Sequence, residues 1–242
     1  QYKTSKNECF NVIFIHGLMS DMNGSKSLAI EEYCKIHNLN FFAFDNLGHG
    51  QSSGNFTELG ISDWKNALDQ FLTLLKLDNI ILIGSSMGGW VSLLSALSAK
   101  HNIKAMILIA PAPDFTVKIE NNLTILEKEK LDNNELIYIK STEDFPGIPI
   151  SKTLIEQGRE NLLLNQERLE LNFPVHILHG MEDEDVDYQI SLKLTNIINS
   201  TYLATKLIKY SEHRFSSQDD ITQIYNSLSE IIAHIENQSK IF

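Results

Sequence analysis

The sequence predicts an α/β fold in which a mostly parallel, doubly wound sheet is covered by helices on both faces. Short, continuous aliphatic runs alternate along the chain with longer segments whose apolar residues recur at helical spacing. Strands without polar alternation are buried on both faces, which is typical of a parallel sheet flanked by helices. The length of 242 residues suits one sizeable domain, so we expect residues 1–242 to form a single unit.

The first half of the chain contains a series of expected strands with helical segments between them. The strands cover residues 10–15, 41–44, 80–83 and 103–109, and helices follow near Ser25, from Trp64 and after Gly89. The segment from Trp64 has the clearest pattern, because its apolar residues recur at i, i+3, i+4, i+7 and i+11. We expect these side chains to pack in the core rather than to bind a ligand.

The regular alternation stops between Asp114 and about Asn172. This segment is charged, poor in strand pattern and interrupted by Pro146, Gly147 and Pro149. We interpret residues 114–172 as an inserted cap or lid made of helices and loops, rather than as a second domain. Its apolar residues either line an acyl pocket or pack the lid onto the core; they include Phe115, Leu123, Leu126, Ile137, Tyr138, Phe145, Ile148 and Ile150.

Beyond Pro174 the alternation returns. Further strands are expected at residues 175–178 and 204–208, and helices at residues 190–198 and 221–235. In open parallel sheets, ligands bind beyond the carboxyl ends of the strands. The polar residues that follow each expected strand are therefore the candidates for function.

Ser86 follows one of these strands, at the centre of a Gly-x-Ser-x-Gly pattern that runs from Gly84 to Gly88. A serine in such a strand-to-helix turn has its hydroxyl exposed above the sheet edge. The alternative interpretation is a helix N-terminus that Ser86 merely caps. Ser85 is the alternative nucleophile in the same turn. It lies one residue earlier, however, where the chain would still be at the end of the strand. We predict that Ser86 is the nucleophile.

A serine hydroxyl needs a base within hydrogen-bond reach, and the base needs a carboxylate that fixes its tautomer. His213 is the predicted base, because it lies in a short polar segment between the last expected strand and the last helix. His16 and His179 each precede a glycine at a strand end, and we expect them to orient loops. Asp183 is the predicted acid because it follows the His179 turn directly, with Asp185 as the alternative in the same acidic loop.

A tetrahedral intermediate also needs backbone N–H donors for its oxyanion. The residue after the nucleophile supplies one of them, which is Met87 in this chain. The second is expected from the loop after the first strand. Leu18 is the preferred candidate there, and Met19 is the alternative.

Composition excludes several classes of protein. The net charge of −11 and the pI near 5.1 disfavour binding to nucleic acid and to anionic lipid surfaces. No run approaches about 18 apolar residues, and the first residues lack the apolar core of a signal peptide. We therefore expect a cytoplasmic protein without stable membrane insertion, although the absent initiator Met is consistent with a removed targeting segment. Nothing in the sequence indicates an oligomeric state.

Cys9 and Cys34 are the two cysteines of the chain, and both lie in or beside apolar stretches. Two cysteines supply neither a disulfide framework nor the ligand spacing of a metal site. We interpret both as buried thiols and expect that the protein uses no metal and no organic cofactor.

Taken together, these motifs resemble the α/β-hydrolase fold superfamily over nearly the whole chain. They are His16-Gly17 after an early strand, Asp45 and Gly48-His49-Gly50-x-Ser52 after the next, Ser86 in its turn, His179-Gly180-x-x-Asp183-x-x-Val186, and His213. The resemblance implies the α/β-hydrolase fold and a serine hydrolase whose catalytic residues occur in the order Ser, acid, His.

A narrower resemblance is to the mitochondrial palmitoyl-protein thioesterases that also cleave mycophenolic acid acyl-glucuronide. The residues that carry it are Met22 to Lys26, Ala29 to Cys34, Gly84 to Trp90, and His213-Arg214. This resemblance implies hydrolysis of carboxylic esters or thioesters, with small molecules or acylated proteins as substrates.

The resulting hypothesis is a serine hydrolase that works through an acyl-enzyme. Ser86 attacks the acyl carbon, His213 takes and returns the proton, and Asp183 orients His213. One alternative is another reaction on the same triad, such as a C–C hydrolase or a lyase; the other is a non-catalytic binding protein. Dehalogenase and epoxide hydrolase chemistry is disfavoured, because those enzymes have an aspartate at the position of Ser86.

Overall fold

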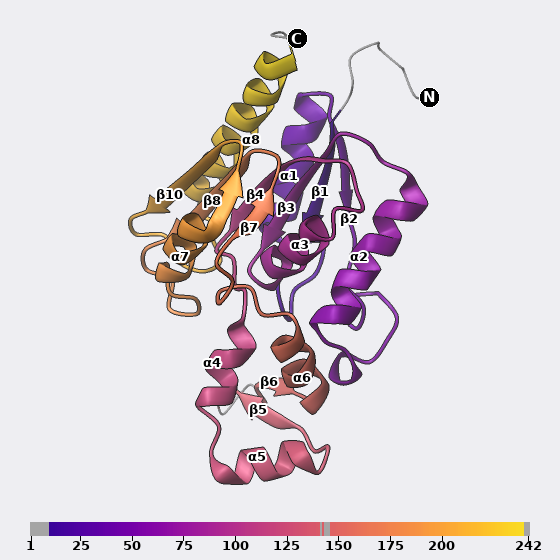
Figure 1. Ribbon diagram of the computed structural model, residues 1–242, viewed down its shortest axis with the longest axis vertical. Coiled ribbons are helices and arrows are strands. Elements are labelled where there is room, and N and C mark those ends of the chain that lie inside the picture. Colours follow the sequence, from indigo (N-terminus) through magenta and orange to yellow (C-terminus); the bar gives the residue numbers. More distant parts are fainter. Residues whose placement is uncertain (1–9, 141, 143–145, 240–242) are drawn as a thin grey trace.

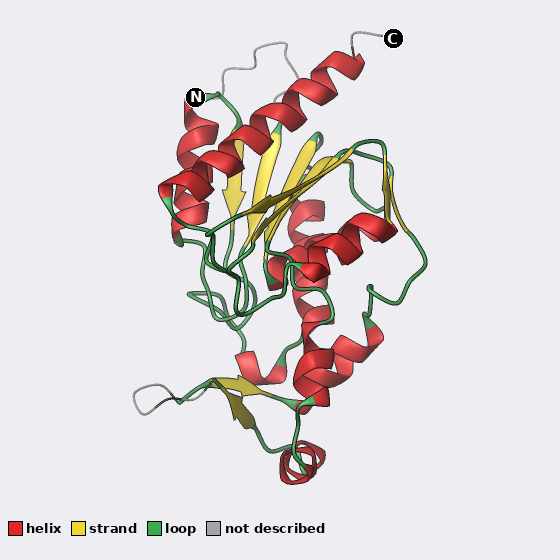
Figure 2. Ribbon diagram, turned by 90° about the vertical axis from the view of Figure 1, so that its left-hand side faces the viewer, coloured by secondary structure: helices red, strands yellow, loops and turns green. Residues whose placement is uncertain are grey.

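The central element of the computed structural model is a sheet of six parallel strands (Figures 1 and 2). The structure describes residues 10–140, 142 and 146–239. The strand order is β10-β8-β4-β3-β1-β2. The bounds are β1 Asn11–Ile15, β2 Asn40–Ala43, β3 Ile80–Ser85, β4 Ile103–Ile109, β8 Val175–Gly180 and β10 Leu203–Ile208. The predicted parallel α/β architecture is thus confirmed.

Helices cover both faces of this sheet, as the continuous aliphatic strands required. Helices α1 (Ser25–Ile36) and α8 (Gln218–Ser239) pack on one face. Helices α2 (Ile61–Leu75), α3 (Met87–Leu97) and α7 (Gln189–Ile197) pack on the other. Alternate residues of a strand point to opposite faces, and β3 shows this directly. Its Ile80 and Leu82 pack with α2 and α3, whereas Ile81 and Ile83 pack with α1 and α8.

Most of the inserted segment lies beyond the carboxyl ends of the strands of the central sheet, at the bottom of Figure 1, and its last strand returns to the side of the sheet, next to α3. It contains α4 (Phe115–Asn121), α5 (Ile125–Asp132), β5 (Ile137–Ile139), β6 (Ile148–Ile150), α6 (Lys152–Glu160) and β7 (Leu169–Leu171). Strands β5 and β6 form an antiparallel pair, and β7 pairs with β9 (Ile198–Ser200). The expectation of helices and loops alone was therefore wrong, because strands of three residues are too short to show a period in the sequence.

Some apolar residues at helix ends also differ from the expectation. Ile198, expected as the last residue of a helix, begins β9. Ile36, an apolar residue at the carboxyl end of α1, is 65% exposed. Cys34 of the same helix is buried, as predicted, whereas Cys9 lies outside the described residues.

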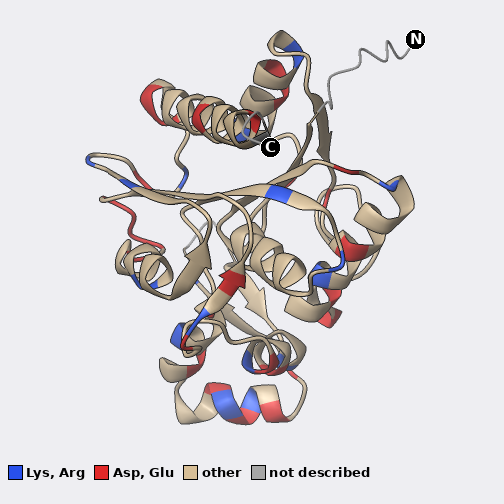
Figure 3. Cartoon of the chain, turned by 45° about the horizontal axis from the view of Figure 1, so that its top comes forward, with Lys and Arg blue, Asp and Glu red and all other residues tan. Residues whose placement is uncertain are grey.

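Acidic and basic residues are interspersed over the visible elements, and α5 contains both (Figure 3). None of the helices in the described ranges combines the length and the apolar character that crossing a bilayer requires.

Candidate active site

Ser86 lies in a strained turn between β3 and α3. Its backbone has φ 54° and ψ −122°, a conformation that costs free energy for any residue with a Cβ. The flanking glycines permit this turn by close packing: a Cβ on Gly88 would lie 2.2 Å from the carbonyl oxygen of Ile15. Ser86 occupies the N-cap position of α3, as the alternative interpretation expected, but its side chain makes no capping hydrogen bond to the helix.

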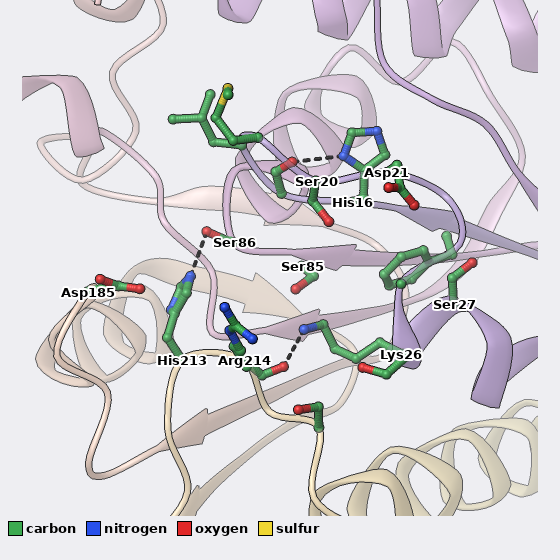
Figure 4. Close-up of a pocket in the computed structure, with 17 residues that line it drawn as sticks. His16, Ser20, Asp21, Lys26, Ser27, Ser85, Ser86, Asp185, His213 and Arg214 are labelled. Carbon is green, nitrogen blue, oxygen red and sulfur yellow. Dashed lines mark hydrogen bonds between the residues drawn. The ribbon is translucent and has the colours of Figure 1, made fainter. Parts of the chain in front are cut away.

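His213 reaches Ser86 from a turn that follows β10. Its Nε2 atom lies 3.1 Å from Ser86 Oγ, and its Nδ1 atom lies 2.7 Å from Asp183 Oδ2 (Figure 4 shows the contact with Ser86). A carboxylate only accepts, so the Nδ1–H of His213 donates to it and Nε2 is left to accept the serine hydroxyl. The structure therefore brings together three residues that are widely separated in the sequence.

Asp183 is held by hydrogen bonds on both of its oxygens. Oδ1 accepts the backbone N–H groups of Asp185, at 2.9 Å, and of Val186, at 2.8 Å. Oδ2 accepts from His213 and also from Nε2 of His179, at 3.1 Å. Burial raises the pKa of the Asp183 carboxyl, but the hydrogen bonds outweigh burial and hold the pKa well below its usual range. The group facing His213 is thus an ionised carboxylate.

Asp185, the alternative acid, has a different role in the structure. Its exposed carboxylate pairs with the Lys140 ammonium, at the end of β5. It makes no hydrogen bond to His213, whereas Asp183 does. The geometry therefore favours Asp183 of the two candidates.

His179 is a member of this network that the sequence singled out only for loop orientation. Its buried ring accepts from the hydroxyl of Ser191 at Nδ1, at 2.6 Å, and its Nε2–H is shared between Asp183 and the carbonyl of Val186. The signal in the sequence was its position, four residues before Asp183 in the same turn. What the sequence did not reveal was the direct hydrogen bond to the acid.

Leu18 and Met87 are placed beside Ser86 by the tight packing of two turns. A Cβ on Gly17 would lie only 3.0 Å from Ser86 Cβ, so the chain before Leu18 passes directly over the serine. Within the described part of the chain, the amides of Leu18 and Met87 donate no hydrogen bond. Both amides are therefore available to an oxyanion. Met19, the alternative donor, has a left-handed backbone with φ 53°.

The His16 side chain supports the turn that contains Leu18. Its Nε2 accepts the backbone N–H of Asn46 at 2.9 Å, so its Nδ1–H donates to the carbonyl of Gly17 at 2.8 Å. Burial lowers the pKa of His16, which keeps the ring neutral for this arrangement. His49, in edge contact with His16, has its pKa lowered by burial to about 4. These histidines hold loops in place and do not reach Ser86.

Two cavities meet at Ser86, and both are lined by Leu18, Ser86, Asp185 and His213. The first, which we call the apolar cavity, has a volume of about 370 Å³ and extends under the inserted segment. Most of its apolar lining comes from that segment: Phe115, Ile119, Leu123, Ile139 and Ile148. The second, which we call the polar cavity, has a volume of about 420 Å³. It lies toward the start of α1 and contains Ser20, Asp21, Lys26, Ser85 and Arg214 (Figure 4).

The apolar residues expected in the inserted segment separate into several groups. Phe115, Leu123 and Ile148 line the apolar cavity. Ile137 and Ile150 are instead buried in the hydrophobic core, while Leu126 and Tyr138 are exposed. Phe145 lies outside the described residues.

Comparison with known proteins identifies the family of the chain. The family model described as alpha/beta hydrolase fold matches residues 11–145. The chain belongs to the alpha/beta hydrolase fold family. The human and bovine proteins named "Palmitoyl-protein thioesterase ABHD10, mitochondrial" are each 31% identical to it over 232 residues, which is 96% of this chain and 76% of theirs.

Solved structures of other family members superpose on most of the chain. Alpha/beta hydrolase domain-containing protein 10 from mouse gives a TM-score of 0.84 at 30% identity, covering 93% of this chain and 90% of that one. A hydrolase from Agrobacterium vitis gives 0.86 at 35% identity, covering 93% and 88%. The resemblance inferred from the motifs, including that to the thioesterases, is thereby confirmed.

The described residues contain no evident metal site. Among them, no group of three or more His, Cys, Asp or Glu side chains is arranged to hold a metal ion. The expectation that the reaction needs no metal or organic cofactor stays a prediction.

Proposed function

We propose that this alpha/beta hydrolase cleaves carboxylic esters or thioesters through an acyl-enzyme formed on Ser86. The observation that carries the proposal is the hydrogen-bonded series from Ser86 Oγ to His213 and on to the buried carboxylate of Asp183. A serine with a positioned base, and a base with a positioned carboxylate, is the arrangement that nucleophilic acyl transfer requires.

In the proposed reaction, Ser86 Oγ attacks the acyl carbon while His213 Nε2 accepts the hydroxyl proton. The amides of Leu18 and Met87 stabilise the negative charge on the carbonyl oxygen, and each donor of this kind lowers the barrier by about 3 kcal/mol. His213 then donates its proton to the departing alcohol or thiol. A water molecule, activated by His213 in the same way, attacks the acyl-enzyme and releases the carboxylic acid.

The substrate class follows from the apolar cavity and from the relatives. A cavity of about 370 Å³ whose apolar lining includes Phe115, Ile119 and Leu123 suits an acyl chain, and the polar lining residues include Lys118, Glu127 and Lys140. The relatives named palmitoyl-protein thioesterase suggest thioesters of acylated proteins as substrates. We propose oxygen esters and small-molecule thioesters beside them, because the same acyl-enzyme chemistry cleaves both kinds of bond. We propose further that residues 1–242 form one domain in which residues 114–172 act as the lid over this cavity.

A fluorophosphonate probe tests the nucleophile directly. The intact protein is expected to take up one label, and Ser86→Ala is expected to take up none. Ser98→Ala is the matched control, because Ser98 follows α3 and does not line either cavity. A folded wild-type protein without label would contradict the proposal.

Matched substrates then establish the bond that is cleaved. Hydrolysis of p-nitrophenyl octanoate and of an S-octanoyl thioester, each lost in Ser86→Ala, is the expected result. Turnover of neither would overturn the assignment of substrate class.

The cytoplasmic location expected from the sequence stays a proposal, and the relatives named above are described as mitochondrial. Fractionation of the native cells, followed by detection of the protein with an antibody, decides between these locations.

A further inference from the structure

The polar cavity has no role in the reaction described above. It opens on the same serine as the apolar cavity, but from the other side, toward the start of α1. An acyl-enzyme reaction needs two spaces at the nucleophile, one for the acyl chain and one for the alcohol or thiol that departs. Since the apolar cavity suits the acyl chain, the polar cavity is left for the departing group.

Two cations face each other in the polar cavity. The ammonium of Lys26 donates a hydrogen bond to the backbone carbonyl of Arg214, and both side chains line the cavity. In the described ranges, no carboxylate forms an ion pair with either cation. Burial lowers the pKa of Lys26 to about 8, and the charge of Arg214 acts in the same direction. At pH 7 a group with this pKa is still about nine-tenths protonated.

The acidic groups near the cavity are either engaged or distant from these cations. The carboxylate of Asp185 is paired with Lys140. Asp21 accepts the N–H of Asn23 at 2.7 Å and lies beside His16, whereas Lys26 and Arg214 lie on the other side of Ser85 (Figure 4). Asp220, which favours the charged form of Lys26, accepts hydrogen bonds from Ser211 and Ser217. The positive charge of the cavity therefore lacks a close partner.

Ser85 provides an independent indication of a ligand. Its residue is only 4% exposed, and its hydroxyl makes no hydrogen bond within the described part of the chain. In Figure 4 this hydroxyl lies in the cavity between Ser86 and Lys26. Helix α1 also begins at the cavity. Its N-cap, Gly24, has no side chain that could accept hydrogen bonds from the first backbone amides of the helix. An anion would accept hydrogen bonds from these donors and offset the proximity of the two cations.

We propose that the polar cavity is a leaving-group subsite for an anionic group, so that preferred substrates are acyl esters or thioesters whose alcohol or thiol carries a carboxylate or a phosphate. This inference rests on the proposed acyl-enzyme function. In this subsite Lys26 makes the main contact with the anion, and Arg214 and Ser85 make supporting contacts.

The test compares esters that differ only in the charge of the departing group. The octanoyl esters of 3-hydroxybenzoate and 3-hydroxybenzamide have nearly the same shape, and 3-hydroxyphenylphosphonate supplies the phosphate-like arm. The measured quantity is kcat/KM for each anionic ester divided by kcat/KM for the neutral amide. This ratio is expected to fall about tenfold or more in Lys26→Met, because hydrogen bonds to charged groups have effects of that order. Lys26→Arg is expected to retain most of the wild-type ratio, because it keeps the positive charge.

Lys35→Met is the matched control, since Lys35 is on the same helix but exposed at its far end. Its ratio should equal that of the wild type. A higher ratio with the carboxylate or with the phosphonate identifies the preferred anion, and either result supports the subsite. Equal ratios in wild type and Lys26→Met, with normal turnover of the neutral ester, overturn the subsite alone. If the wild type hydrolyses none of the esters and takes no fluorophosphonate, the proposed function and the subsite both fail.

Discussion

The apolar and polar cavities flank one serine and have similar volumes, about 370 and 420 Å³, but they are built from different parts of the chain. The apolar cavity is lined mainly by the inserted segment, through α4 and the β5–β6 pair. The polar cavity is lined by the turns after β1 and β10, by the end of β3 and by the start of α1. Changes in the insertion should therefore alter acyl-chain preference, whereas changes at the strand ends should alter the chemistry and the choice of leaving group.

The largest expected effect is at the shared point of the two cavities. Ser86→Ala and His213→Ala should each reduce kcat by about 10⁶, because removal of a nucleophile or its base disables the whole unit. Both anionic and neutral esters should be affected equally, and circular dichroism should show a retained fold. If either variant kept activity within tenfold of the wild type, the two cavities would not share this reaction centre.

A smaller but still large effect is expected for the acid. Asp183→Asn should reduce kcat by roughly 10⁴, as in other triads, because an amide no longer stabilises the correct tautomer of His213. Asp185→Asn is the matched control in the same loop, and only a change of a few fold is expected from losing its exposed pair with Lys140. The opposite ranking of the two variants would show that the acid is wrongly assigned.

The apolar cavity is tested by a change that shortens it. In the wild type, each added methylene of the acyl chain contributes about 0.8 kcal/mol, or roughly fourfold in kcat/KM, until the cavity is filled. Ile119→Trp places bulk in the cavity and should lower kcat/KM for decanoyl esters while sparing butyryl esters. Ile125→Trp is the control, because Ile125 is in the same insertion but 80% exposed. Parallel chain-length profiles in all three proteins would contradict the acyl-pocket assignment.

The smallest expected effect is on folding stability, which the buried positive charge of Lys26 in the polar cavity lowers. The pKa of Lys26 is about 8 in the folded protein and about 10.4 in an unfolded chain, so between these values the unfolded state binds more protons. Folding stability due to this group therefore rises with pH across that window, and the cost of burying the charged ammonium is fully present below pH 8.

Lys26→Met removes this cost. Its Tm should exceed that of the wild type by a few degrees at pH 7, and the difference should shrink as the pH approaches 10. A difference that is independent of pH would mean that the lysine charge is not the cause.

The sheet and its strand-end residues were predictable because physical patterns in the sequence are strongest there. Continuous aliphatic runs identified the buried strands, and the parallel sheet then placed Ser86 and His213 at one edge. The choice between Asp183 and Asp185 was less certain, because spacing alone does not show which carboxylate receives the amides of its own loop. The structure separates them by hydrogen bonds: Asp183 receives those amides, and Asp185 pairs with Lys140.

The insertion and the polar cavity were less accessible to sequence reasoning. Strands of three residues in a charged segment leave no period to detect, so the β5–β6 pair was missed. Leu126 and Tyr138 are exposed, which apolar character alone did not reveal. Lys26 is distant in sequence from Arg214, and their proximity arises only when α1 packs beside the turn after β10.

The most direct test of the central claim is to trap the acyl-enzyme. The wild-type protein is mixed with p-nitrophenyl octanoate, quenched in acid within the first turnover, and analysed by peptide mass spectrometry. We predict a burst of about one p-nitrophenolate per active protein and one octanoyl group on the peptide that contains Ser86, both absent in Ser86→Ala. An octanoyl group on another residue, or hydrolysis without any acylated peptide, would contradict it.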